Sequence, residues 1–109
     1  MKYNVIASEN FKSEFKRLHK KYPSLKNDVN SLIIALETNP GLGSLLGKAC
    51  YKIRLAIKSK GTGKSGDGRV ISLVRIRKEE VTLLSIYDKS EKETISDQEL
   101  IKLIFLVKD

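Results

Sequence analysis

Residues 51–69 read Tyr51-Lys-Ile-Arg-Leu-Ala-Ile-Lys-Ser-Lys-Gly-Thr-Gly-Lys-Ser-Gly-Asp-Gly-Arg69. The first half alternates strictly between two sets: Tyr51, Ile53, Leu55 and Ile57 in one, and Lys52, Arg54, Ala56 and Lys58 in the other. A period of two predicts a β-strand with one buried face and one solvent-exposed, cationic face. The stretch from Lys58 to Arg69 holds four glycines and three lysines. A cationic strand that leads into a cationic, glycine-rich loop indicates a polyanionic partner.

The composition is that of one globular domain over residues 1–109. Hydrophobic residues make up 40% and charged residues 31%, which argues against a disordered chain. Lys and Arg number 21 against 13 Asp and Glu, for a net charge of +8. This excess favours nucleic acid or an acidic partner, the alternative being a generally basic soluble protein. An anionic membrane is disfavoured because no basic helix carries a Trp-rich apolar face.

The cysteine content and the apolar runs bear on the compartment. Cys50 is the only cysteine, so an intramolecular disulfide is impossible and a reducing cytoplasm is the simpler environment. The N-terminus lacks a long apolar segment, and no run approaches the length of a membrane span. We therefore expect a soluble cytoplasmic protein.

The N-terminal half predicts one strand and two helices. They are a strand at 3–7, a helix at about 10–21, and a second helix that Pro23 opens and Asn39-Pro40-Gly41 ends. Ser8 or Asn10 is expected to cap the first helix. Because a proline joins the two helices, they are expected to form a helical hairpin. His19, the only histidine, is expected on the solvent face, with no second histidine to pair with for metal binding or acid–base exchange.

The C-terminal half predicts three strands and a helix. Residues 41–49 lack clear periodicity and are expected to be a connection. The strand from Tyr51 is followed by strands at 69–77 and 81–87, rich in β-branched and aliphatic residues, which complete an antiparallel meander. A capping box at 96–99 predicts a short helix after them. The predicted order is β-α-α-β-β-β-α.

This order occurs together with three short motifs. They are Tyr51-Lys-Ile-Arg54, the Gly/Lys loop that closes on Gly68-Arg69-Val-Ile71, and Leu83-Leu-Ser-Ile-Tyr-Asp-Lys-Ser-Glu91. In order and spacing the chain resembles the RelE/ParE superfamily of toxins from bacterial type II toxin–antitoxin modules. It looks most similar to RelE-like and HigB-like members that carry a long basic loop between the second and third strands.

The resemblance implies a fold and a choice of activities. The fold is α+β, with the helical hairpin and the C-terminal helix packed with a mostly antiparallel four-stranded sheet. The RelE-like branch implies cleavage of mRNA in the ribosomal A site, without a metal or another cofactor. The ParE branch implies inhibition of DNA gyrase, and a third reading is a non-catalytic RNA-binding relic. In either toxin branch the partner is a cognate antitoxin, in the HigB-like group commonly a small helix-turn-helix protein.

RNA cleavage by the 2′-hydroxyl needs a base, an acid for the leaving oxygen, and positive charge at the phosphate. The sequence has no histidine pair and no carboxylate cluster with metal-ligand spacing, which leaves its cations. Arginine suits the charge-stabilising role because its planar fork binds phosphate oxygens bidentately. A lysine acts as a base only where its surroundings lower its pKa.

The resemblance implies a catalytic set of four residues: Lys52, Arg54, Arg69 and Tyr87. It does not assign the base and the acid among them. Further contacts to RNA or the ribosome are predicted for four lysines: Lys58, Lys60, Lys64 and Lys89. In an antiparallel meander, the end of one strand lies beside the start of the next. Lys58, Arg69 and Tyr87 are therefore expected to converge at one end of the sheet.

Overall fold

A computed structural model describes residues 2–60, 67–92 and 94–107 of the chain. In chain order, the elements are β1 (Asn4–Ala7), α1 (Glu9–Lys21), α2 (Leu25–Thr38), β2 (Ser44–Gly47), β3 (Cys50–Ala56), the 3₁₀ turn η1 (Lys58–Lys60), β4 (Asp67–Arg75), β5 (Glu80–Asp88) and α3 (Asp97–Leu106). The strands form one sheet in the order β1-β5-β4-β3-β2. β1 pairs with β5 in parallel, and the other neighbours pair antiparallel. The predicted α+β fold is confirmed, with five strands in the sheet where four were expected.

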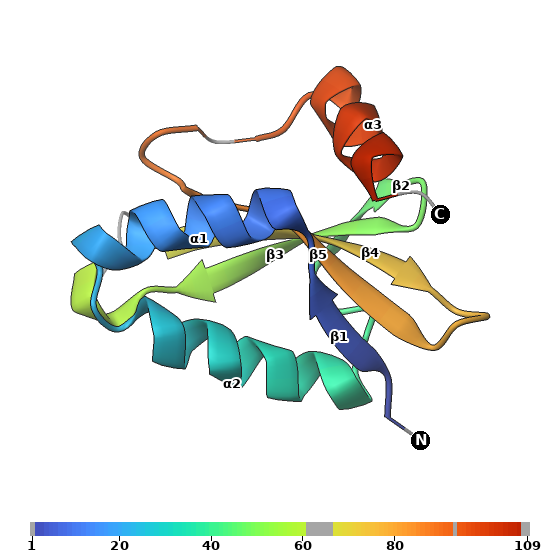
Figure 1. Ribbon diagram of the computed structural model, residues 1–109, viewed down its shortest axis with the longest axis horizontal. Helices are drawn as coiled ribbons and strands as arrows, with labels where there is room; N and C mark the ends of the chain where they lie inside the picture. The colour runs from blue at the N-terminus through green and yellow to red at the C-terminus, as the bar shows by residue number, and fades with distance from the viewer. Residues whose placement is uncertain (1, 61–66, 93, 108–109) are drawn as a thin grey trace.

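Two apolar clusters use alternate side chains of the central strands, so they lie on the two faces of the sheet. Val70 and Leu83 pack with residues of α1 and α2. Ile71 and Leu84 pack with Leu100 of α3. Figure 1 shows α1 and α2 as the two arms of a hairpin, with α3 set apart from both. The predicted helical hairpin is therefore confirmed, and each sheet face has its own helical cover.

The helix starts follow the capping signals in the sequence. The Phe11 amide donates to Ser8 Oγ at 3.0 Å, which identifies Ser8 as the cap of α1 and starts that helix one residue before the predicted position. At α3, the Glu99 amide donates to Ser96 Oγ at 3.1 Å, and the Ser96 amide donates to Glu99 Oε1 at 3.3 Å. This is the predicted capping box.

The strand β2 lies in the stretch that was expected to be a connection, and this expectation was wrong. β2 pairs with β3 through a two-residue turn at Lys48 and Ala49, where Gly47 lies opposite Cys50. Lys48 and Ala49 have φ values of 55° and 61°. Tight hairpin turns with positive φ at both positions usually contain Asn or Gly. The Lys-Ala sequence therefore gives no indication of a turn. β2 is also short and at the sheet edge, and it lacks the alternation of a half-buried strand.

Side chains of helix α1 form hydrogen bonds with β5 at a β-bulge. The β4–β5 register shifts by one residue, which leaves Leu84 as the extra residue of β5. Glu14 accepts from Ser85 Oγ at 2.8 Å and from the Ile86 amide at 3.2 Å. Asn10 Nδ2 donates to the Leu84 carbonyl at 2.9 Å. Side chains of α1 thus satisfy the backbone groups that the bulge releases from the ladder.

Candidate active site

A row of cations crosses the sheet on the face opposite α1 and α2. Arg54 of β3 lies directly opposite Arg69 of β4, and Arg69 lies directly opposite Tyr87 of β5. Residues that face each other across neighbouring strands project from the same side of the sheet. Lys52 is two residues before Arg54 and shares that side. Its neighbours Ile53 and Leu55 point the other way, into the α1–α2 cluster.

Three of the four predicted catalytic residues line one hollow. This hollow has a volume of about 270 Å³, and Gly43, Ser44, Lys52, Arg54 and Arg69 line it. Gly43 has a φ of 101°, and a Cβ there would collide with the Lys52 carbonyl oxygen. Only glycine therefore brings the chain before β2 so close to β3. Gly43 and Ser44 were missed by the sequence interpretation because β2 itself was missed.

Each arginine of the row is held by one local bond. Arg54 Nε is ion-paired with Asp67 Oδ2, and Arg69 Nη1 donates to the Gly68 carbonyl at 3.0 Å. The Asp67 side chain is 9% exposed, against 66% for Arg54. A guanidinium has five N–H donors, so each arginine keeps further donors for a ligand. Arg54 and Arg69 lie directly opposite each other, and such like-charge pairs are unfavourable. The negative charge of Asp67 offsets part of this repulsion at Arg54, and the lining of the hollow stays cationic.

Tyr87 lies beside Arg69 on the same face of the sheet but does not line the hollow. Its side chain packs in the α3 cluster, and the residue is 3% exposed. Within the described part of the chain, its hydroxyl has no hydrogen-bond partner. Burial raises the pKa of Tyr87, and the nearby Arg69 lowers it in part. The structure places the hydroxyl inside a core and not at the hollow. An acid–base role for Tyr87 therefore stays a prediction from the resemblance.

Lys58 does not converge with Arg69 as expected. The chain leaves β3 after Ala56 and turns into η1, where the Lys58 amide donates to Asp28 Oδ2 of α2 at 3.2 Å. Arg54 takes the position opposite Arg69 instead. Lys58 is exposed on the α2 side, so it lies apart from the hollow.

The other three predicted RNA contacts differ in placement. The Lys60 ammonium is 2.7 Å from Asp88 Oδ1, and its side chain is 11% exposed. Lys60 is therefore a structural cation, and we leave it out of the RNA-contacting set. The Lys89 amide donates to the Asp67 carbonyl at 3.3 Å, which places Lys89 at the strand end beside the Arg54–Asp67 pair. Lys64 lies outside the described residues.

Asp88 is the centre of a buried polar cluster that the sequence interpretation did not find. Its carboxylate accepts from Lys60 Nζ and from the Tyr22 hydroxyl, each at 2.7 Å, and from the Ser90 amide at 3.0 Å. Burial alone would raise the pKa of Asp88, but these bonds outweigh it and hold the pKa well below its usual range. The bond to Asp88 raises the pKa of Tyr22 to about 12. The cluster joins the end of α1, the turn η1 and the end of β5.

Two properties of the described residues bear on metal binding and on membranes. Among residues 2–60, 67–92 and 94–107, no group of three or more His, Cys, Asp or Glu side chains is arranged to hold a metal ion. In the same residues, no helix has the length and apolar character needed to cross a membrane.

The fold of the chain matches solved structures of a bacterial toxin. A variant of the Escherichia coli toxin RelE with two arginines replaced by alanine, in the free state, superimposes with a TM-score of 0.67. The match covers 95% of this chain and 99% of that chain at 20% identity. The chain has the RelE fold. This agrees with the order of elements and with the sheet described above.

Two further RelE structures match in the same way. The isolated E. coli RelE toxin gives a TM-score of 0.60 at 21% identity, over 94% of this chain and 98% of that chain. A chain of the intact E. coli RelBE toxin–antitoxin complex gives 0.59 at 19% identity, over 79% of this chain and 95% of that chain. No protein-family model and no curated protein matches the sequence.

Proposed function

We propose that this chain is the toxin of a type II toxin–antitoxin pair and a metal-independent endoribonuclease that cleaves mRNA on the ribosome and so inhibits translation in the cytoplasm. The observation that carries the proposal is the hollow lined by Lys52, Arg54 and Arg69 on a RelE fold. A cationic hollow with unused guanidinium donors suits a phosphate group. Lys58, Lys64 and Lys89 stay predicted contacts to RNA or the ribosome, and of these Lys89 lies at the strand end beside the Arg54–Asp67 pair.

The chemistry is attack of a ribose 2′-hydroxyl on the adjacent phosphorus. The 2′-oxygen forms a bond to phosphorus, the bond to the 5′-oxygen breaks, and the products are a 2′,3′-cyclic phosphate and a free 5′-hydroxyl. The attacking hydroxyl loses a proton, and the leaving oxygen gains one. Arg54 and Arg69 bind the phosphate oxygens on which charge builds up in the transition state. Removal of one such preorganised donor costs about 10²–10³-fold in rate in well-studied enzymes.

The ribosome supplies what the hollow lacks. Among the described residues, those that line the hollow include no histidine and no carboxylate, so the usual acid–base pair is not found there. Holding the 2′-hydroxyl in line with the scissile bond compensates for part of the missing acid–base catalysis, since good orientation corresponds to effective concentrations of about 10⁵–10⁸ M. A toxin with a weak site of its own would therefore act on mRNA that the ribosome already holds in place.

The partner in this proposal is a cognate antitoxin, expected to be a small helix-turn-helix protein. A related E. coli toxin was crystallised in an intact RelBE toxin–antitoxin complex. A chain with a net charge of +8 also suits an acidic neutralising partner through long-range attraction.

The test is to map the 5′ ends of cellular mRNA after brief induction of the protein. We expect cuts within translated regions in phase with the reading frame. Arg69→Ala and Lys52→Ala should each lower cleavage about 10²-fold or more without unfolding the chain. Arg77→Ala is the matched control, because Arg77 is exposed in the turn between β4 and β5. Intact mRNA with inhibited supercoiling by gyrase would replace the proposal with the ParE-like activity, and salt-sensitive RNA binding without cleavage would replace it with the relic.

A further inference from the structure

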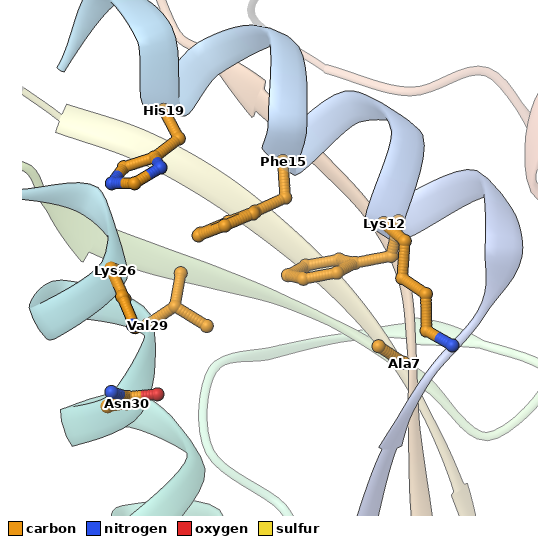
Figure 2. Close-up of a pocket in the computed structure, with 8 residues that line it drawn as sticks. Ala7, Lys12, Phe15, His19, Lys26, Val29 and Asn30 are labelled. Atoms are coloured by element: carbon orange, nitrogen blue, oxygen red, sulfur yellow. The ribbon is translucent and has the colours of Figure 1, made fainter. Parts of the chain in front are cut away.

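A second hollow, larger than the cationic one, lies on the other face of the sheet, between α1 and α2. It has a volume of about 470 Å³, within the range of about 300–1,000 Å³ for ligand sites. Its lining residues are Ala7, Phe11, Lys12, Phe15, His19, Lys26, Val29 and Asn30. Figure 2 shows the rings of Phe15 and His19 projecting from α1 toward Val29, Lys26 and Asn30 on α2. We call this hollow the α1–α2 groove.

One wall of the α1–α2 groove is a ladder of stacked rings. The Phe11 and Phe15 centroids are 6.4 Å apart, and those of Phe15 and His19 are 5.3 Å apart, with interplanar angles of 15° and 19°. Phe11 and Val29 are buried, while Phe15 and His19 are only partly covered. His19 was expected to face solvent, but its stacking on Phe15 makes it part of an apolar wall.

The charged residues on the rim of the groove are cationic. Lys12 and Lys26 are both exposed, and none of the lining residues in the described part of the chain is a carboxylate. Lys12 makes an ion pair with Glu9 at 3.2 Å, but both side chains are largely exposed, at 62% and 92%. Such surface pairs are weak and exchange readily for another acidic partner. The groove therefore offers an apolar floor with positive charge at its mouth.

The length of the ladder indicates the shape of the occupant. Phe11 and His19 are eight residues apart on one helix, which at 1.5 Å per residue is about 12 Å. An amphipathic helix that binds in a groove presents anchors at i, i+3 or i+4, and i+7, a span of about 10.5 Å. Two turns of helix therefore match the wall, and acidic residues beside the anchors would meet Lys12 and Lys26.

We propose that the α1–α2 groove is the docking site for an acidic amphipathic helix of the neutralising partner protein. The proposal rests on the proposed function in naming that partner as the source of the helix. The groove and the cationic hollow use opposite faces of the sheet, because Ile53 and Leu55 point toward the helices whereas Arg54 points away. A helix in the groove therefore anchors the partner without occupying the site for RNA.

The test uses two synthetic 14-residue peptides and the full chain. The acidic peptide carries Leu at i, i+4 and i+7 and Glu on its other faces, and the basic peptide has Lys in place of each Glu. We expect amide chemical shifts of residues 11–30 to move with the acidic peptide only. Binding should weaken as salt is raised. Lys26→Glu should weaken it about fivefold, since it removes one favourable charge and adds a repulsive one.

Lys102→Glu is the matched control, an exposed position on α3 with the same change of charge. Equal binding of both peptides, shifts confined to α3, equal weakening by Lys102→Glu, or no binding at millimolar peptide would each overturn the proposal. Self-association of the chain that Lys26→Glu abolishes would also overturn it, because the occupant would then be a second copy. The mRNA cleavage assay tests the proposed function separately. Cleavage without peptide binding would refute only the proposed docking site, and peptide binding without cleavage would refute only the proposed endoribonuclease activity.

Discussion

Replacing Asp88 by Asn tests the buried cluster that joins α1, η1 and β5. Asp88 is 1% exposed, and Lys60 Nζ and the Tyr22 hydroxyl each lie 2.7 Å from its carboxylate. The amide keeps the size of the side chain but leaves the Lys60 ammonium buried without a counter-charge. Breaking a buried ion pair in this way costs about 3–5 kcal/mol. Because the Lys60 side chain is 11% exposed, we expect the lower end, about 3 kcal/mol.

The assay is urea unfolding followed by circular dichroism, with a thermal melt as a second readout. A loss of about 3 kcal/mol is a large part of the 5–15 kcal/mol that stabilises a typical domain. At roughly 4 °C per kcal/mol for a chain of this size, Tm should fall by about 12 °C. Asp97→Asn, at an exposed position in the first turn of α3, is the matched control and should change stability by less than about 0.5 kcal/mol.

The pH dependence gives an independent check. The pKa of Asp88 in the folded chain is lowered, so its contribution to stability is fully present above the unfolded-state pKa of about 3.9 and is lost as the pH falls through the folded-state pKa. The wild type should therefore lose more stability below about pH 4 than Asp88→Asn does. If the free energy of unfolding of Asp88→Asn lay within 1 kcal/mol of the wild-type value, with the same acid dependence, the cluster would not contribute to stability as described above.

Two further substitutions test the site. Gly43→Ala should destabilise the chain by about 1–3 kcal/mol and weaken RNA binding, because the new Cβ meets the Lys52 carbonyl and displaces the chain before β2. Gly47→Ala is its control, since Gly47 has a φ of 97° but nothing within 4 Å; equal losses in both would mean that backbone strain alone explains the effect. Tyr87→Phe should raise stability by about 1 kcal/mol, because it removes a buried hydroxyl without a partner in the described residues. The same variant tests the predicted acid–base role of Tyr87: a loss of mRNA cleavage above tenfold would support that role, and unchanged cleavage would remove Tyr87 from the catalytic set.

Periodicity was enough to predict the strands and helices that bury one face. The alternation from Tyr51 to Ile57 correctly separates the buried Ile53 and Leu55 from the exposed Arg54. The capping residues likewise predicted the starts of α1 and α3. These features are local, because a side chain on a strand or helix is buried or exposed according to its own spacing.

The register of the sheet and the buried charges could not be predicted in the same way. Residues 57–66 separate β3 from β4, and their sequence does not indicate which residues of the two strands face each other, so Lys58 was expected near Arg69 where Arg54 lies. Lys60 was expected to contact RNA because it follows a cationic strand. Its burial depends on Asp88, which is 28 residues away and reads as part of a charged loop.

The place of β5 in the sheet has a consequence for synthesis of the protein. β5 lies between β4 and β1, and nearly all of it is buried. β1 is made first and finds its parallel partner only when residues 80–83 exist, a pairing over a long sequence separation of the kind that folds slowly. Until then α1 has no bulge to bind and Arg69 has no neighbour on its other side. Both apolar clusters include residues of β5, so a nascent chain cannot complete either core, or place Tyr87 beside Arg69, until β5 has been made.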